Sequence, residues 1–228
     1  MRALPSTKRR GFTLVELLVV IAIVAGLAAV ATAAFQRMRA KAADLGEVSR
    51  MRSLGLAIHG WASEHQGRAP RSSHSAIGHR ELGWMREILP RLGYDDTDRD
   101  TLAAAKEPVF GIDPDADPPR SPMLNVYFEL DPDYDDYEGA PATWRVPSAV
   151  SAPASTVLLA MAHGREDHLM AQYFAGTMDD LPAARPGSDV GCVVWVDGHV
   201  TLESGGALFD SKRSLDRFHP DKAGKPEG

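Results

Sequence analysis

The sequence is poor in several residue types, and each shortage limits what the chain can be. Its 228 residues include one cysteine, Cys192, so no disulfide can form within the chain and cysteine usage says little about its compartment. No proline occurs between Pro5 and Pro70, which leaves that stretch free of helix-breaking residues. Residues 12–228 hold 21 basic and 31 acidic side chains, a net charge of −10. This balance argues against nucleic acid as the main partner.

Short motifs of several enzyme classes are also missing. The sequence contains no G-x-S-x-G nucleophile elbow, no G-x-x-x-x-G-K-[ST] phosphate loop and no G-x-G-x-x-G fingerprint. The eight histidines lack the H-E-x-x-H or cysteine-paired spacing of zinc sites. A Ser-His-Asp set that assembles only in space stays open, because such triads are defined by geometry rather than by order. No motif here favours an enzyme, and we expect no cofactor other than the calcium ion considered below.

One long apolar run lies near the N-terminus. From Phe12 to Phe35 every residue is apolar or glycine except Thr13, Glu16 and Thr32. A helix needs roughly 20 predominantly apolar residues to span the hydrocarbon core of a bilayer, so the run is long enough. Basic residues precede it, which favours a cytoplasmic N-terminus, although three more follow between positions 37 and 41.

Several kinds of N-terminal segment fit this run. Ala31-Thr32-Ala33 suits a secretory signal peptidase and would give a mature chain starting at Ala34, but the apolar stretch exceeds the usual ~7–15 residues. Arg9-Arg10 suits a twin-arginine export signal, although the run that follows is unusually hydrophobic. An uncleaved anchor beginning at Met1 is a third hypothesis, with Glu16 extending to the lipid headgroups.

A fourth hypothesis comes from a resemblance. The stretch GFTLVELLVVIAIVAGLAAVA resembles the N-terminus of type IV pilins and type II secretion pseudopilins. In that family a prepilin peptidase cuts after the glycine that ends a basic leader and methylates the new N-terminal residue, usually phenylalanine. The fifth mature residue is a glutamate. Gly11, Phe12 and Glu16 match these three positions, which implies a leader over residues 1–11 and a transmembrane and filament-core helix over residues 12–35.

The same resemblance gives Glu16 a role. An acidic side chain at the centre of a bilayer costs roughly 2.5–3.5 kcal/mol on insertion scales. The family implies that the amine created on Phe12 pairs with Glu16 of a neighbouring subunit in a pilus or pseudopilus. It also implies four partners: the prepilin peptidase, other pilin-like subunits, an inner-membrane assembly platform and membrane lipid. The chain would cross the bacterial inner membrane once, with its globular domain outside the cytoplasm. A binding or enzymatic domain on a membrane anchor or behind a signal peptide is the rival hypothesis.

A helical pattern continues beyond the apolar run. Apolar residues recur every three or four positions from residue 35 to residue 61, while charged residues such as Glu47 lie largely off that stripe. Gly67 and Pro70 indicate where the helix ends. We therefore expect residues 36–66 to be an amphipathic continuation of the same helix.

Residues 67–210 predict an α+β head. LGWMREILPRLGY (residues 82–94) predicts a short helix, and residues 107–122 a loop rich in proline and aspartate. Strands are expected in MLNVYFEL (residues 123–130), in STVLLAMA (residues 155–162) and on both sides of Asp197-Gly198, a preferred two-residue hairpin turn. Residues 211–228 are polar and expected to fray. The expected fold is α+β and pilin-like, a long N-terminal helix packed on a small antiparallel sheet.

A weaker resemblance covers four later segments, RMRSLGLAIHGWASEHQGRAP, WMREILPRLGY, ASTVLLAM and VVWVDGHV. In this order they are similar to a large family of bacterial pilin-like proteins, named for a C-terminal signature of histidine, nine residues and Asp-Gly. Asp197-Gly198 is present here, but the position ten before Asp197 is Gly187 rather than histidine, and His199 follows the turn instead. The resemblance bears on fold more than on function.

Two further groups of residues are candidates for binding. Asp131, Asp133, Asp135 and Asp136 lie in ELDPDYDDYE, and closely spaced carboxylates suit Ca2+, which some pseudopilins hold in a loop after their sheet. The run lacks EF-hand spacing, so a solvated acidic loop is the alternative. The four tryptophans, at positions 61, 84, 144 and 195, could form a ligand platform, with core packing as the alternative.

Overall fold

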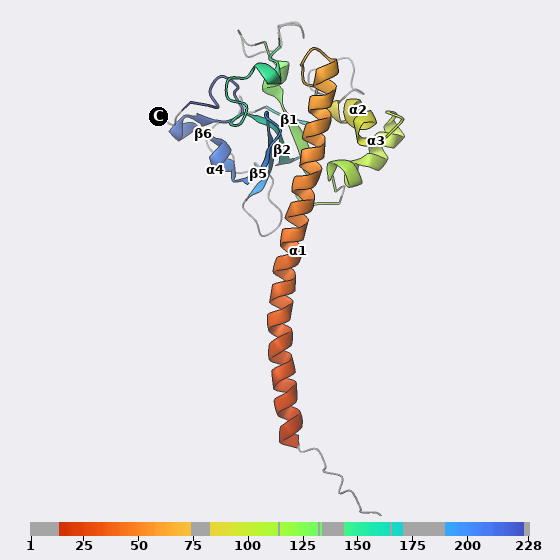
Figure 1. Cartoon of the computed structure of the whole chain (residues 1–228), viewed down its shortest axis with the longest axis vertical. Coiled ribbons are helices and arrows are strands. Elements are labelled where there is room, and N and C mark those ends of the chain that lie inside the picture. The colour runs from red at the N-terminus through yellow and green to blue at the C-terminus, as the bar shows by residue number, and fades with distance from the viewer. Residues whose placement is uncertain are drawn as a thin grey trace, which may run out of the picture. The chain divides into compact units, whose positions relative to one another are not determined.

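The chain divides into two compact units, Met1–Leu45 and Gly46–Gly228. The computed structural model describes residues 14–73, 83–113, 115–131, 133, 144–164, 166–170 and 190–225. Helix α1 (Leu14–Glu64) begins in the first unit and ends in the second, and all the other elements belong to the second unit (Figure 1). The long N-terminal helix predicted from the sequence is thereby confirmed.

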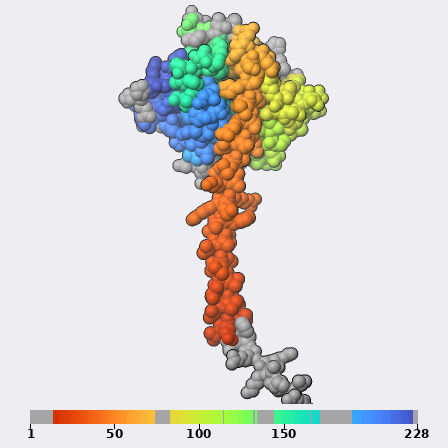
Figure 2. Space-filling model, in the orientation of Figure 1, coloured from red at the N-terminus to blue at the C-terminus, as the bar shows by residue number. Residues whose placement is uncertain are grey.

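Within the second unit, α1 is buried on one side from Glu47 onward. Met51, Leu54 and Ile58 are at most 1% exposed, which confirms the apolar stripe predicted for this part of the helix. Figure 2 shows this part of α1, in orange, between the yellow-green α2–α3 region and the blue C-terminal strands. Glu47 departs from the prediction, because it is buried rather than facing solvent.

The end of α1 follows the expected signals. The helix stops at Glu64, and Gly67, with φ of +81°, donates its N–H to the carbonyl of Ala62 at 2.8 Å. A left-handed glycine that returns its N–H to the last turn is a common way of ending a helix, because glycine adopts positive φ without a Cβ clash.

Short helices follow α1. They are α2 (Trp84–Ile88), the 3-10 turn η1 (Leu89–Leu92), α3 (Arg99–Ala105) and the π turn η2 (Lys106–Phe110). The helix predicted at residues 82–94 is confirmed over its described part. The loop predicted from residue 107 was wrong at its start, because η2 continues the helical path of α3. Asp98 caps α3 by accepting the N–H of Thr101 at 2.7 Å.

The main sheet has five strands in the order β3-β1-β2-β4-β5. Its members are β1 (Arg120–Asn125), β2 (Val157–His163), β3 (His168–Leu169), β4 (Gly191–Trp195) and β5 (Val200–Glu203). The pairs β1–β2, β2–β4 and β4–β5 are antiparallel, whereas β1 and β3 are parallel. The α+β class is therefore confirmed, with a mixed sheet in place of the purely antiparallel one expected.

The strand predicted at residues 123–130 ends early. β1 stops at Asn125, and residues Val126–Glu129 form a 3-10 turn, η3. The Asn125 side chain accounts for the change. Its oxygen accepts the N–H of Tyr127 at 3.2 Å, and its amide donates to the carbonyls of Val157 and Phe218, both at 2.8 Å. A buried amide with three partners fixes a turn where apolar composition alone favours a strand.

The hairpin at Asp197-Gly198 exists, but its loop is one residue longer than predicted. Gly198 donates its N–H to the carbonyl of Trp195 at 2.9 Å, and Trp195 donates its own N–H to the carbonyl of His199 at 3.0 Å. Gly198 has φ of +88°, whereas Asp197 does not have positive φ. A two-residue type I′ turn requires positive φ at both central residues, so the loop is a three-residue turn with glycine in the left-handed position.

Both faces of the sheet are buried, and the C-terminal segment covers one of them. In β4, Cys192 and Val194 face the cluster that contains α1, while Val193 and Trp195 face a second cluster that contains Phe218. α4 (Gly205–Leu208), β6 (Phe209–Asp210), the 3-10 turn η6 (Ser211–Arg213) and β7 (Leu215–Asp216) form that cover. In Figure 1, α4 and β6 lie on the opposite side of β1 and β2 from α2 and α3.

The frayed tail expected from residue 211 was wrong over the described residues 211–225. β6 pairs with β7 in a second, two-stranded antiparallel sheet. Phe218 is fully buried, and Leu215 and Ala223 are nearly so. The apolar second face of the main sheet explains this order, because residues of the tail remove that face from water.

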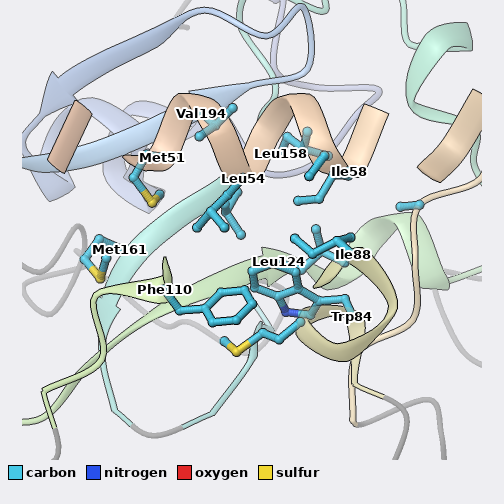
Figure 3. Close-up of a cluster of buried hydrophobic side chains, with 14 of the residues drawn as sticks. Met51, Leu54, Ile58, Trp84, Ile88, Phe110, Leu124, Leu158, Met161 and Val194 are labelled. Atoms are coloured by element: carbon cyan, nitrogen blue, oxygen red, sulfur yellow. The ribbon is translucent and has the colours of Figure 1, made fainter. Parts of the chain in front are cut away.

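The first cluster forms the main core. Figure 3 shows Met51, Leu54 and Ile58 of α1 facing Trp84 and Phe110 across it. The rings of Trp84 and Phe110 meet edge to face, with centroids 5.8 Å apart and planes at 84°. At its border, Glu47 forms a buried ion pair with Arg120, whose Nη2 lies 3.0 and 3.2 Å from the two carboxylate oxygens. The pair ties α1 to the first residue of β1.

Gly55 marks the closest approach of α1 to the sheet. A Cβ built on this residue would lie 2.7 Å from Cγ1 of Val194, a fully buried side chain of β4. A β-branched side chain in a packed core has few alternative rotamers, so one of the two elements would have to move.

We predict that Gly55→Ala lowers the free energy of unfolding by about 1–2 kcal/mol, because overpacking exceeds the gain in helix propensity. Gly46→Ala is the matched control on the same helix, since nothing lies within 4 Å of its Cβ position. It should raise stability by up to about 1 kcal/mol. Urea unfolding of the full chain in detergent micelles measures both. If the two substitutions changed the free energy of unfolding equally, the close approach of α1 to β4 at Gly55 would be contradicted.

Candidate functional site

The described part of the first unit, residues 14–45, is helical, and apart from Glu16 and Thr32 its residues 14–35 are apolar or glycine on all sides. Among the described residues one helix, α1, is long and apolar enough to cross a membrane, and none of that stretch is buried within the chain. Large apolar side chains from Leu14 to Met38 are exposed, including Val30 at 72%. A helix that is apolar all round needs a lipid or protein environment, because its surface is too large to leave in water.

Glu16 is the acidic residue in the first turn of this helix. A carboxylate at a helix N-terminus is stabilised by the backbone dipole, by about 0.3–1 kcal/mol at an exposed position. Gly11 and Phe12, the expected processing residues, lie outside the described residues. Their geometry relative to Glu16 is therefore untested, and the pairing of Phe12 with Glu16 stays a prediction.

The turn residues Asp197 and Gly198 form a structural corner. Asp197 Oδ1 accepts the N–H of His199 at 3.1 Å and lies 2.5 Å from its ring Nδ1. The His199 ring stacks on Trp195, with centroids 5.5 Å apart. Partial burial raises the pKa of Asp197, but its hydrogen bonds to His199 outweigh that effect and leave the pKa below its ordinary value. These contacts stabilise the hairpin. Gly187 lies outside the described residues.

Ser73, Asp167 and His168 lie together in the second unit, but their hydrogen bonds do not have the arrangement of a catalytic triad. Asp167 Oδ1 accepts a hydrogen bond from the Ser73 hydroxyl at 2.6 Å and lies 3.0 Å from His168 Nδ1. The carboxylate thus stands between the hydroxyl and the imidazole, whereas a triad needs the imidazole in the middle. Burial raises the pKa of Asp167, and these hydrogen bonds lower it further than burial raises it. Trp84 Nε1 also donates to the Asp167 carbonyl at 2.6 Å. Asp167 therefore connects the segment around Ser73 to the core.

The structure describes only two of the four aspartates in the calcium hypothesis. Asp135 and Asp136 lie outside the described residues. Asp131 is buried, and its Oδ1 accepts the N–H of Asp133 at 2.9 Å in a local turn. Among the described residues, no group of three or more histidine, cysteine, aspartate or glutamate side chains is arranged to hold a metal ion.

Glu87 of α2 has a raised pKa, although no motif in the sequence singles it out. Burial raises its pKa to about 7; the nearby charge of Glu129 acts in the same direction, while His65 and Arg71 oppose it. The buried Oε2 atom of Glu87 has no hydrogen-bond partner among the described residues. The surroundings of Glu87 come from three segments distant in sequence, so no local motif points to it.

Comparison with known proteins gives one match. Residues 6–32 match the family model of the prokaryotic N-terminal methylation motif, a range that contains Gly11, Phe12 and Glu16. No curated protein and no solved structure matches the chain. The resemblance to type IV pilins and pseudopilins is therefore confirmed at the N-terminus. The second resemblance, to the family with the C-terminal Asp-Gly signature, stays a prediction.

We predict that the raised pKa of Glu87 makes the protein less stable as the pH rises from about 4.5 through about 7. The folded state binds its proton more tightly than the unfolded state does, so stability is full below the unfolded pKa and falls as the carboxyl ionises. Because the residue is partly exposed, solvent screening limits the loss to about 1–2 kcal/mol.

The test compares Glu87→Gln with the wild type by urea unfolding at pH 5 and at pH 8. The variant should be the more stable protein at pH 8 and similar to the wild type at pH 5. Glu203→Gln, on β5, serves as the control for loss of an acid elsewhere and should leave the pH dependence as it is. If the stability of Glu87→Gln depended on pH as that of the wild type does, the assignment of this pH dependence to Glu87 would be contradicted.

Proposed function

We propose that the chain is a structural pilin-like subunit, made as a prepilin and assembled into a type IV pilus or a type II secretion pseudopilus. The methylation motif at residues 6–32 carries this proposal, because it joins a cleavage site to an exposed apolar helix. In this role the protein is a substrate of the prepilin peptidase and not an enzyme. Its proposed role is to assemble with other subunits.

The exposed apolar surface of α1 is suited to two successive environments, the membrane and the filament. Before assembly, the apolar helix crosses the inner membrane, where each buried CH2 group contributes about 0.8 kcal/mol relative to water. In a filament, the same surface is covered by the helices of neighbouring subunits. Both environments remove the side chains between Leu14 and Phe35 from water, so the helix can exchange lipid for protein contacts.

The membrane topology follows from the same helix. Basic residues precede the apolar run, so the leader lies on the cytoplasmic side and the second unit lies outside the cytoplasm. Cleavage after Gly11 then creates the N-terminal amine of Phe12 near the cytoplasmic interface. In the filament that amine neutralises Glu16 of an adjacent subunit, which removes the cost of a carboxylate in an apolar core.

The first experiment is an intact mass and an N-terminal peptide map of the protein from membranes of its native host. A chain that starts at N-methylated Phe12 is the expected result. A start at Ala34 would mean cleavage by signal peptidase, and a start at Met1 would mean an uncleaved anchor. Either would overturn the proposal in favour of an exported or anchored domain.

We predict that Glu16→Ala gives a processed, membrane-inserted protein that does not enter filaments. Loss of about 1.4 kcal/mol per subunit contact lowers an association constant tenfold, and a filament repeats that contact in every subunit. Sheared filament fractions, examined by immunoblot and electron microscopy, measure assembly. Membrane fractionation and the N-terminal mass confirm insertion and processing.

Thr32→Ala is the matched control within the same apolar run. The Thr32 hydroxyl donates to the carbonyl of Ala28 at 2.7 Å, so its polar group is satisfied within its own helix. This variant should assemble as the wild type does. Normal filaments from Glu16→Ala would refute the pairing, whereas equal failure of both variants would show that assembly depends on helix surface rather than on the charge.

A further inference from the structure

A concave pocket of about 490 Å³ opens in the second unit, beside the C-terminal end of α1. We name it the tryptophan pocket and define it by Trp61, Trp144, Glu87, Arg68 and Arg71, which line it. These residues come from α1, from the segment that follows it, from α2 and from the chain just before η4 (Pro147–Ala149). All of them belong to the second unit, so the pocket does not involve the N-terminal segment.

The two tryptophans of the pocket are held in place by planar neighbours. The Trp61 ring stacks on His65, with centroids 3.6 Å apart and planes at 3°, and His65 Nδ1 lies 2.7 Å from the Trp61 carbonyl. The Arg71 guanidinium lies over the Trp144 ring, 5.4 Å from its centroid. Trp61 and Trp144 are partly exposed, whereas the other two tryptophans are buried in the core. Of the four tryptophans considered from the sequence, these two line a pocket and the other two belong to the core, so a ligand platform stays a prediction for this pair.

The remaining wall of the pocket is polar and balanced in charge. Glu64 and Glu87 bring two carboxyl groups, and Arg68 and Arg71 bring two guanidinium groups. Gln66, which also lines the pocket, accepts a hydrogen bond from Arg68 at 2.8 Å. A strongly charged ligand of either sign would meet like charges here. A wholly apolar ligand would leave these polar groups without partners, which costs about 1–3 kcal/mol for each buried group.

We propose that the tryptophan pocket binds an uncharged oligosaccharide. A sugar ring has an apolar face of C–H groups, which fits an indole, and a rim of adjacent hydroxyls. Carboxylates, guanidinium groups and amides each present two donors or acceptors in one plane, so they can bind two adjacent hydroxyls at once. The volume lies in the usual range for small-ligand sites, about 300–1,000 Å³.

Glu87 gives the pocket a specific acceptor. Its Oε2 atom is buried and lacks a partner among the described residues, so a ligand hydroxyl can supply the missing hydrogen bond. With a pKa of about 7, Glu87 is ionised at pH 8 and accepts charge-assisted hydrogen bonds there. The other charged or titratable groups near it are Glu64 of α1, then His65, Arg68 and Arg71 of the segment that follows α1, and Glu129 of η3.

The test uses the full chain in micelles of a detergent without a sugar headgroup, at pH 8. The probes are cellotriose, maltotriose and tri-N-acetylchitotriose, each at about 5 mM, a concentration that detects millimolar affinity. Saturation-transfer NMR reports binding, and calorimetry gives the Kd. We expect at least one trisaccharide to bind, and Trp144→Ala and Glu87→Gln each to weaken its binding about tenfold or more, about 1.4 kcal/mol.

Leu202→Ala and Glu203→Gln, both on β5 and outside the pocket, are the matched controls and should leave the Kd unchanged. Near-UV circular dichroism establishes that each variant is folded; if Trp144→Ala does not fold, Glu87→Gln decides. Three results would overturn the proposal: no transfer to any trisaccharide, binding that survives both pocket substitutions, or tighter binding of a tripeptide such as Gly-Trp-Gly. The outcome is independent of filament assembly, because no residue of the N-terminal segment takes part.

Discussion

Helix α1 lies so close to β4 at Gly55 that no side chain fits between them, and the rest of the second unit is arranged around this contact. The hydrogen of Gly55 faces Val194, and the neighbouring side chains of α1, Met51, Leu54 and Ile58, enter the core beside it. Trp84 and Phe110 fill the space that remains. Because interiors are packed as densely as organic crystals, the helix and the sheet have one relative position in which all these side chains fit.

The second face of the sheet sets the remaining architecture. Successive residues of a strand point to opposite faces, so burying Val194 against α1 turns Val193 and Trp195 away from it. That face would be apolar and exposed without the C-terminal segment. Phe218 covers it, and the Asn125 amide links the Phe218 carbonyl to the carbonyl of Val157 on β2. A tail that is polar in composition is therefore ordered by a few apolar residues.

Features fixed by local pattern could be predicted from the sequence, and features fixed by distant partners could not. The 3.6-residue period of α1, the strand predicted at residues 155–162 and the glycine of the hairpin are local, and all are present, the strand as β2 at Val157–His163. The burial of Glu47 depends on Arg120, and the end of β1 depends on three partners of Asn125. The tryptophan pocket likewise draws Trp61, Glu87 and Trp144 from segments that no spacing rule connects.

Three acidic residues in apolar surroundings show why the candidate functional site could not be predicted in full from the sequence. Glu47 is buried beside a guanidinium of the same chain, whose Nη2 lies within 3.2 Å of both carboxylate oxygens. No such ion pair is formed by Glu87 within the described part of the chain, and burial raises its pKa to about 7. Glu16 lies in the first turn of a helix whose large apolar side chains are exposed. Under the proposed function, this carboxylate meets the N-terminal amine of a neighbouring subunit, which is the group that prepilin processing supplies and which offsets the cost of a charge in apolar surroundings.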